Sequence, residues 1–313
     1  MSNNNLAAAK STKNDEFYTQ FKDIEHEIKA YVDYSPGLFE GKTVLLPCDN
    51  YLYSNFTRYF SDNFKRFGLK KLVSTCYSRS SSGTVFVVDS SGNKSVENLK
   101  GNGDFRSDEI KKYRSEADYI ITNPPFSLYR DFIEWVCEDD KKFLVVGNKN
   151  SITYREIFPL ILGNRLWSGV TKWSGGMWFF TDYHSENLAN VASAWFTNIE
   201  HGRRHEHLRL STMEENIKHG KHKSIRENGY QKYDNYDALE VPYSDAIPSD
   251  YSGVIGVPIT FLEKHNPEQF QIIGATESEG KGFSNGLWDS SSNISQPLVN
   301  GKRIYKRFFI RKI

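Results

Sequence analysis

Four residues, Asn123-Pro124-Pro125-Phe126, directly follow an apolar, partly β-branched run at residues 119–122. Such a run is typical of a buried strand in a parallel sheet. The two prolines exclude further strand pairing and an immediate helix, so the chain must leave the sheet as a stiff loop. We therefore expect these four residues at the carboxyl edge of the sheet, where open α/β sheets bind ligands.

The groups in this loop suit one chemical task. Asn123 has a side-chain amide oxygen, Pro124 has a backbone carbonyl in a stiff segment, and Phe126 has an aromatic face. Together they could hold the amino group of a planar substrate that contains nitrogen. The alternative is a Pro-Pro turn followed by an ordinary hydrophobic phenylalanine. The position directly after a buried strand favours the ligand-binding interpretation.

The elements that would position this loop alternate between strands and helices. Ser54 is a candidate N-cap for a helix between two strand-like runs, so residues 43–77 predict a βαβ unit and hence a parallel sheet. The expected strands are residues 43–46, 71–77, 84–88, 95–99, 119–122 and 142–147. The expected helices begin near residues 21, 54, 107, 127 and 154. This alternation favours an α/β fold with a doubly wound, mostly parallel sheet.

Two aromatic runs, residues 176–180 and 194–199, follow these helices. They predict an antiparallel hairpin at the edge of the sheet.

The composition limits the classes of protein that the chain can represent. It has 313 residues with a formal net charge of +1, so the overall charge does not point to a polyanionic partner. Its three cysteines, Cys48, Cys76 and Cys137, form no CxxC pair, and we expect them to be reduced. No apolar run approaches the roughly 18 residues that a membrane span requires. We expect a soluble, cytoplasmic protein without a membrane partner.

The character of the chain changes near residue 200. Residues 1–14 are small and polar, and we expect them to be disordered. Residues 15–200 carry the alternating pattern and form the expected catalytic domain. Residues 201–313 contain basic segments, tyrosines and short strand-like runs, and form the expected target-recognition region.

Several other segments support a resemblance that extends over most of the chain. They are residues 15–19, 55–60, 68–72, 103–107, 122–128 and 256–262. In this order they resemble the EcoRI-type adenine-specific DNA methyltransferase family. One short motif would be weak support, whereas several collinear motifs are fairly specific. The resemblance implies a Rossmann-like methyltransferase fold with a C-terminal target-recognition region.

The resemblance also implies a reaction, the transfer of a methyl group from S-adenosyl-L-methionine to adenine N6 in double-stranded DNA. An aromatic amine is a poor nucleophile because its lone pair is delocalised into the ring. Two acceptors, the Asn123 oxygen and the Pro124 carbonyl, would hold its hydrogens and aim the lone pair at the methyl group. This is catalysis by orientation and charge stabilisation. Phe126 would stack on the adenine, which must be flipped out of the duplex.

The implied cofactor contacts come from several segments. Phe17, Tyr18 and Thr19 match the segment that contacts the methionine part of the cofactor, and Asp104, with Phe105 beside it, matches the acidic residue for its adenine amine. Asn123 would lie at the junction of donor and acceptor. The first strand ends in Pro47-Cys48-Asp49-Asn50 and lacks the usual GxG. Asp49 is placed to reach the ribose or the amino-acid moiety, and Tyr77 is the candidate ribose contact by position.

Trp195 and Phe196 are candidates for a second aromatic wall of the base pocket, or else are shared between core and surface. The basic segments could contact DNA phosphates, and the alternative is a solvated face. The candidate phosphate contacts are Arg203, Arg204, Lys221, Lys223, Arg226, Lys302, Arg303, Lys306 and Arg307. The histidines lack cysteine partners and HExxH spacing, so we expect no metal.

Two other functions remain open from the sequence. One is an RNA-base or protein-glutamine N-methyltransferase that uses the same loop. The other is a DNA-binding protein with an inactive methyltransferase core, which the missing GxG would explain. A cognate restriction endonuclease is compatible with the leading interpretation, but no direct protein partner is implied.

Overall fold

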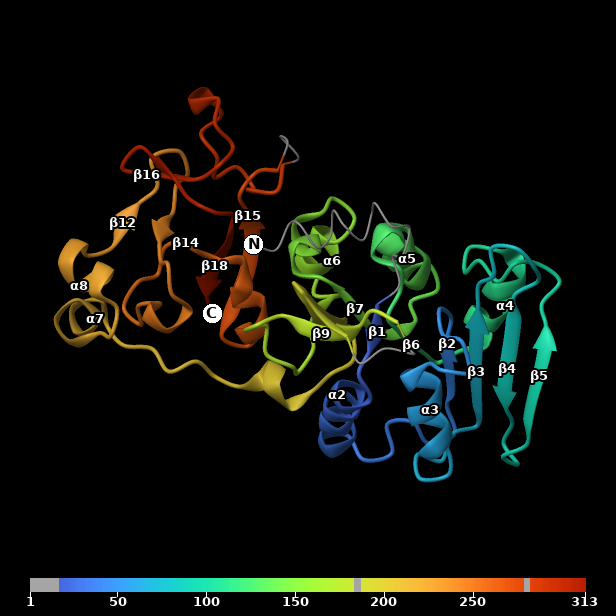
Figure 1. The fold of residues 1–313 in the computed structure, drawn as a ribbon. Helices are drawn as coiled ribbons and strands as arrows, with labels where there is room; N and C mark the ends of the chain where they lie inside the picture. The colour runs from blue at the N-terminus through green and yellow to red at the C-terminus, as the bar shows by residue number, and fades with distance from the viewer. Residues whose placement is uncertain (1–16, 183–186, 279–281) are drawn as a thin grey trace. The chain divides into compact units, whose positions relative to one another are not determined.

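The computed structural model describes residues 17–182, 187–278 and 282–313, so the N-terminal residues for which we expected disorder lie outside the described chain. The chain divides into two compact units (Figure 1). Unit 1 comprises Met1–Ser151 and Leu166–His201, and unit 2 comprises Ile152–Arg165 and Gly202–Ile313. The segment Ile152–Arg165, which we expected in the catalytic domain, therefore groups with the second unit.

The main sheet of unit 1 confirms the expected α/β fold. In the described part of the chain it has eight strands, in the order β5-β4-β3-β2-β6-β7-β11-β8. The central strands run parallel: β3 (Lys71–Cys76), β2 (Thr43–Leu46), β6 (Tyr119–Thr122) and β7 (Lys142–Asn148). The flanking strands are antiparallel to their neighbours: β5 (Lys94–Asn98), β4 (Thr84–Val88), β11 (Ser193–Thr197) and β8 (Trp167–Ser168).

The order of the central strands creates a switch point. From β2 the chain moves to β3 on one side, and it later returns to β6 on the other side of β2. The loops after β2 and β6 therefore start from neighbouring strands. Such a reversal of strand order opens a crevice at the carboxyl ends, which is where open α/β sheets bind ligands.

Amphipathic helices cover the main sheet. The helix α2 (Phe21–Tyr34) buries apolar residues three and four apart, and α3 (Asn55–Asp62) begins at Ser54, whose side chain accepts from the backbone N–H groups of Phe56 and Thr57. One hydrophobic cluster joins α2 and α3 to alternate residues of the central strands. The helices α4 (Asp108–Glu116) and α5 (Tyr129–Cys137) lie away from α2 and α3 (Figure 1). Helices thus flank the sheet as the alternating pattern predicts.

The predicted edge hairpin is wrong. The first aromatic run forms β9 (Met177–Phe180), which pairs with β1 (Tyr18–Thr19) and β10 (Leu188–Val191) in a separate small sheet. The second run forms β11, which lies inside the main sheet between β7 and β8. The hairpin partner of β9 is the short strand β10, whose mixed composition gave no strand signal.

A buried carboxylate anchors α2. Glu27 accepts from the backbone N–H groups of Val170 (2.6 Å) and Thr171 (2.8 Å) and from the Thr171 hydroxyl (2.5 Å). Burial raises the pKa of Glu27, and these hydrogen bonds oppose the shift. At Gly169 a Cβ atom would lie 2.2 Å from the Glu27 Oε1 atom, so only glycine fits beside this carboxylate.

In the described residues of unit 2, five strands form a sheet in the order β12-β13-β14-β18-β15, and two more form the hairpin β16-β17. The strands are β12 (Gln231–Lys232), β13 (Leu239–Glu240), β14 (Ile255–Pro258), β15 (Phe270–Ala275), β16 (Leu298–Val299), β17 (Lys302–Arg303) and β18 (Arg307–Lys312). The helices are α6 (Phe158–Leu162), α7 (Met213–His219) and α8 (Lys223–Asn228). Unit 2 thus has its own sheet and its own core.

Candidate active site

A cavity of about 370 Å³ lies within unit 1 at the carboxyl ends of β2, β3 and β6. Its lining comes from the segment around β1, the loops after those three strands and the turn before α4. It includes nearly all of the residues that we expected to hold substrate or cofactor: Phe17, Tyr18, Thr19, Asp49, Tyr77, Asp104, Phe105, Asn123, Pro124, Pro125 and Phe126.

The side chain of Asn123 has one satisfied end and one unsatisfied end. Its Nδ2 atom donates to the Phe17 carbonyl at 2.6 Å, which fixes the orientation of the amide. Its Oδ1 atom is buried and accepts no hydrogen bond from the described residues. An unsatisfied buried acceptor costs about 1–3 kcal/mol. The cavity therefore offers an acceptor that a hydrogen-bond donor of a ligand would satisfy.

Aromatic rings surround the same loop. The Phe126 ring stacks on Phe17 with centroids 5.7 Å apart, and it meets the edge of Phe179 at 6.2 Å. Phe179 also contacts Phe17 at 5.8 Å. Phe126 remains half-buried and lines the cavity. Residues on β9 and before β1 thus support one side of the ring.

Asp49 connects the elements that carry the loop. Its Oδ1 atom accepts from the Ser54 hydroxyl and its Oδ2 atom from the Thr122 hydroxyl, both at 2.6 Å. Burial raises the pKa of Asp49 to about 6, and the two hydrogen bonds oppose the shift. The carboxylate thus fixes both the start of α3 and the residue before Asn123. A direct contact between Asp49 and a ligand stays a prediction.

Asp104 is held in its ionised form beside the cavity. The Arg106 guanidinium donates to both oxygens of Asp104, at 3.0 and 2.7 Å, and lowers the pKa of that carboxyl. Arg106 also reaches Asp131 on α5 at 3.2 Å. At Gly103, where φ is +82°, a Cβ atom would lie 2.4 Å from the Cys76 carbonyl oxygen. Glycine is therefore required for this turn to approach the end of β3.

The other predicted cofactor contacts, Phe105, Thr19 and Tyr77, differ in how deeply they are buried. The ring of Phe105 is buried against Phe132 and Trp135, with centroids 5.1 and 5.5 Å apart, so this residue anchors the turn. Thr19 is buried, and its hydroxyl has no partner among the described residues. Tyr77 is exposed at the cavity lining. The individual cofactor contacts of these residues stay predictions.

The structure contradicts the second aromatic wall that we expected. Trp195 and Phe196 are both 0% exposed and do not line the cavity. Trp195 packs against Phe56, with centroids 5.9 Å apart, and Phe196 packs against Tyr129. The physical reason is that β11 is an interior strand, so both of its faces are covered.

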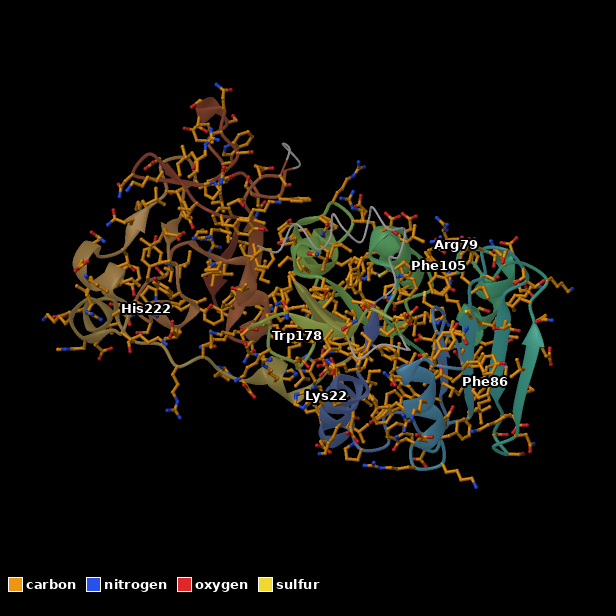
Figure 2. All side chains as sticks on the ribbon, in the orientation of Figure 1. Lys22, Arg79, Phe86, Phe105, Trp178 and His222 are labelled. Atoms are coloured by element: carbon orange, nitrogen blue, oxygen red, sulfur yellow. The ribbon has the colours of Figure 1, made fainter. Side chains whose placement is uncertain are left out.

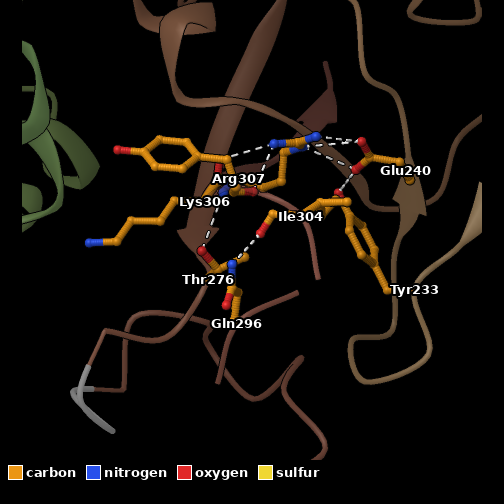
Figure 3. Close-up of polar contacts among 8 residues, drawn as sticks. Tyr233, Glu240, Thr276, Gln296, Ile304, Lys306 and Arg307 are labelled. Atoms are coloured by element: carbon orange, nitrogen blue, oxygen red, sulfur yellow. Dashed lines mark hydrogen bonds and ion pairs between the residues drawn. The ribbon is translucent and has the colours of Figure 1, made fainter. Parts of the chain in front are cut away.

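Two of the candidate phosphate contacts are buried and hydrogen-bonded. Arg307, 9% exposed, donates to both oxygens of Glu240, which also accepts from the Tyr233 hydroxyl (Figure 3). Arg204 is buried and donates to Asn164. The prediction of these two arginines as phosphate contacts is therefore wrong, because both side chains are buried and hydrogen-bonded within unit 2.

The other basic candidates lie at or near the surface of unit 2. Lys221 pairs with Asp245, and Lys223 lies 3.6 Å from Glu227. Arg226 on α8 is exposed and donates to the Gly220 carbonyl, and Arg203 is half-buried.

The cations of the hairpin β16-β17 differ from those lysines in having no acidic partner in the described chain. Lys302 and Arg303 are exposed and have no ion pair within the described residues. Asp234 accepts from the backbone N–H groups of Asn300 (3.2 Å) and Gly301 (2.7 Å), which holds the turn. Lys306, beyond the hairpin, donates to the Thr153 hydroxyl at 3.0 Å.

The cavity also contains residues that sequence reasoning missed. Arg106 adjoins the Asp104 turn, and Ser54 and Asn55 lie where α3 begins. The Asn55 amide donates to the Thr19 carbonyl at 2.8 Å and so fixes β1. The N-cap pattern at Ser54 was the available signal, whereas nothing local links Asn55 to residue 19.

The described residues contain neither a candidate metal centre nor a candidate membrane span. Across residues 17–182, 187–278 and 282–313, no group of three His, Cys, Asp or Glu side chains is placed to hold a metal. Over the same residues, no helix is both long and apolar enough to span a membrane.

The crevice lies at a switch point of the sheet, and the Asn123 amide oxygen in it can accept a hydrogen bond from a ligand. This arrangement fits an α/β methyltransferase that acts on an amine. Comparison with known proteins makes the class specific. Residues 5–313 match the family model described as "Adenine-specific methyltransferase EcoRI". The chain belongs to this family, which confirms the resemblance and the enzyme class that the sequence predicts.

Three relatives match along nearly their whole length. The Type II methyltransferase M.EcoRI of Escherichia coli is 37% identical, over 98% of this chain and 95% of the relative. Type II methyltransferase M.MpnI of Mycoplasma pneumoniae is 34% identical, and M.MgeORF184P of Mycoplasma genitalium is 33% identical, each over 97% of both chains. No solved structure matches the chain.

Proposed function

We propose that this protein transfers the methyl group of S-adenosyl-L-methionine to N6 of an adenine that is flipped out of duplex DNA. The observation that carries the proposal is the buried, unsatisfied Oδ1 atom of Asn123 beside the half-buried ring of Phe126. An exocyclic amine can donate one hydrogen to this oxygen and the second to the carbonyl of Pro124. Stacking on Phe126 would orient the ring of the base.

The lining residues suit the methyl donor. The Thr19 hydroxyl is buried without a partner, and it could donate to the carboxylate of the donor. The ionised carboxylate of Asp104 could accept from the adenine amine of the donor, and Tyr77 is placed for the ribose. When bound, S-adenosyl-L-methionine supplies an electrophilic methyl group. Phe17, Tyr18 and Asp49 complete the proposed donor side.

In this proposal Asn123 holds the amine so that the lone pair on nitrogen points to the donor. The Phe17 carbonyl keeps the amide from rotating, because only Nδ2 can donate to it. The Asp49–Thr122 hydrogen bond fixes the residue before the loop. Acceptors at the amine hydrogens also stabilise the positive charge that develops on nitrogen as the methyl group arrives.

Residues 201–313 are the proposed DNA-recognition region, and residues 15–200 are the proposed catalytic region. The exposed cations of the hairpin β16-β17 are the strongest candidates for phosphate contacts, because no internal carboxylate in the described chain competes for them. A duplex DNA substrate is compatible with the cytoplasmic location that we propose. It also fits a role in self-protection beside a restriction nuclease.

A methyl-transfer assay tests the proposal directly. The protein is incubated with tritiated S-adenosyl-L-methionine and with duplex DNA, RNA or protein, each with and without the matching nuclease or protease. We expect label only in DNA, and N6-methyladenine after digestion. Label only in RNA or protein would select the alternative methyltransferases. If calorimetry detects no binding of S-adenosyl-L-methionine, even with DNA present, the methyltransferase core is inactive.

A further inference from the structure

The small sheet β1-β9-β10 has two faces of opposite character. Its register places Tyr18 opposite Phe180 and Phe180 opposite Leu188, while Thr19 lies opposite Phe179. Directly paired residues share a face, and successive residues alternate. The face that carries Phe179 is buried in the core of unit 1.

The other face is exposed and largely apolar. Trp178 is 52% exposed and Leu188 is 43% exposed, and Tyr18 and Phe180 are half-buried beside them. We call Tyr18, Trp178, Phe180 and Leu188 the outer sheet face. Tryptophan is highly buried on average, so an exposed indole within an apolar group is typical of an interaction site.

This face adjoins the candidate active site at Tyr18. Tyr18 belongs both to the outer sheet face and to the cavity lining. Phe179, the neighbour of Trp178 on β9, lies on the opposite face of the sheet. Its ring contacts Phe126, with ring centroids 6.2 Å apart. The Gln20 amide donates to the Trp178 carbonyl at 2.7 Å. The backbone of Trp178 (Figure 2) is therefore held beside the end of β1.

We infer that the outer sheet face, with Trp178 at its centre, binds a nucleobase of the substrate DNA next to the flipped adenine. The inference rests on the proposed function. Flipping removes the target base from the stack, so its neighbours each lose a stacking partner. An indole supplies a flat apolar surface of the right size, and stacking on aromatic side chains accepts any base. Trp178 would thus compensate part of the unstacking cost.

The test compares Trp178→Ala and Trp178→Phe with Tyr34→Ala. Tyr34 is a similarly exposed aromatic residue, at 48%, but it lies on α2 and does not line the cavity. We expect Trp178→Ala to raise the Kd for duplex DNA about 5-fold to 100-fold. Trp178→Phe should retain most of the affinity, and Tyr34→Ala should match the wild type. The affinity for S-adenosyl-L-methionine should not change in any variant.

A second arm uses a duplex with a mismatch at the target adenine, in which flipping costs less. The defect of Trp178→Ala in the single-turnover methylation rate should be smaller on this DNA than on the matched duplex. Wild-type Kd values and rates for Trp178→Ala would overturn the inference. So would loss of donor binding, which indicates a structural role. A lower oligomeric state in Trp178→Ala than in the wild-type protein would also overturn it, because it indicates that a second copy of the chain binds this face.

The two proposals can fail separately. If the wild-type protein does not methylate DNA, the proposed function is wrong. If it does and Trp178→Ala behaves as the wild type, only the inference about the outer sheet face is wrong.

Discussion

The loop at Asn123 and the basic residues of unit 2 were both singled out by residue type, yet the structure treats them in opposite ways. The loop leaves one polar atom unsatisfied, since the buried Oδ1 atom of Asn123 has no partner in the described chain. Arg307 and Arg204 are instead buried and bound to Glu240 and Asn164. A residue type therefore indicates function only where the fold leaves its polar atoms unsatisfied or exposed.

The largest expected effect tests the internal role of Arg307. We expect Arg307→Leu to lower the free energy of unfolding by about 3–5 kcal/mol, because Glu240 would remain buried without its partner. Urea denaturation measures this, and Lys223→Ala on α8 is the control, with an expected change below about 0.5 kcal/mol. If Arg307→Leu unfolds like the wild type but loses DNA affinity, Arg307 contacts DNA and the contrast between the two regions fails.

The second prediction tests the available oxygen of Asn123. Asn123→Ala should lower kcat by about 10²-fold to 10³-fold, since it removes an acceptor that stabilises developing charge. The affinity for duplex DNA should persist. Single-turnover methylation and DNA titration measure the two quantities, and Asn63→Ala at the C-cap of α3, outside the cavity lining, is the control. Near-normal turnover in Asn123→Ala would refute the assignment of the loop.

The third prediction concerns the carboxylate that supports the loop. The pKa of Asp49 is about 6 in the folded protein against an ordinary value of 3.8, so folding favours the protonated form. The resulting stabilisation is present below about pH 4 and is lost as the pH rises through 6. The two-unit difference corresponds to about 3 kcal/mol.

Asp49→Asn, which does not titrate, is the reference for this effect. Denaturation curves at pH 4, 5, 6 and 7 should show the wild type losing stability relative to the variant. Parallel pH profiles would show that the carboxylate is better solvated than its burial indicates.

The smallest expected effect concerns the cations that remain available. Lys302→Ala combined with Arg303→Ala should reduce the slope of log Kd against log salt by up to about 2, because each phosphate contact contributes about 0.9. The matched pair Lys221→Ala with Lys223→Ala should change the slope less, since those lysines have acidic partners. Equal slopes for both double variants would show that the cations of the hairpin contact phosphates no more than Lys221 and Lys223 do.

Most of the elements around the site were predictable because their signals are local. The apolar run before Asn123 is β6, and Ser54 caps α3 as expected. The aromatic runs were harder, because a strand signal does not specify its partner. Trp195 therefore looked like a pocket wall and is a core residue, whereas the run at 177–180 supports Phe126 through Phe179.

The sequence by itself determined the parallel core of the sheet, the stiff loop after β6 and the family. These follow from periodicity, from proline geometry and from collinear motifs, all of which are properties of neighbouring residues. Only the tertiary structure decided which polar atoms stay unsatisfied, which arginines are buried within unit 2, and which aromatic rings reach the surface. Those outcomes depend on contacts between residues far apart in the chain, such as Asn123 with Phe17 and Arg307 with Glu240.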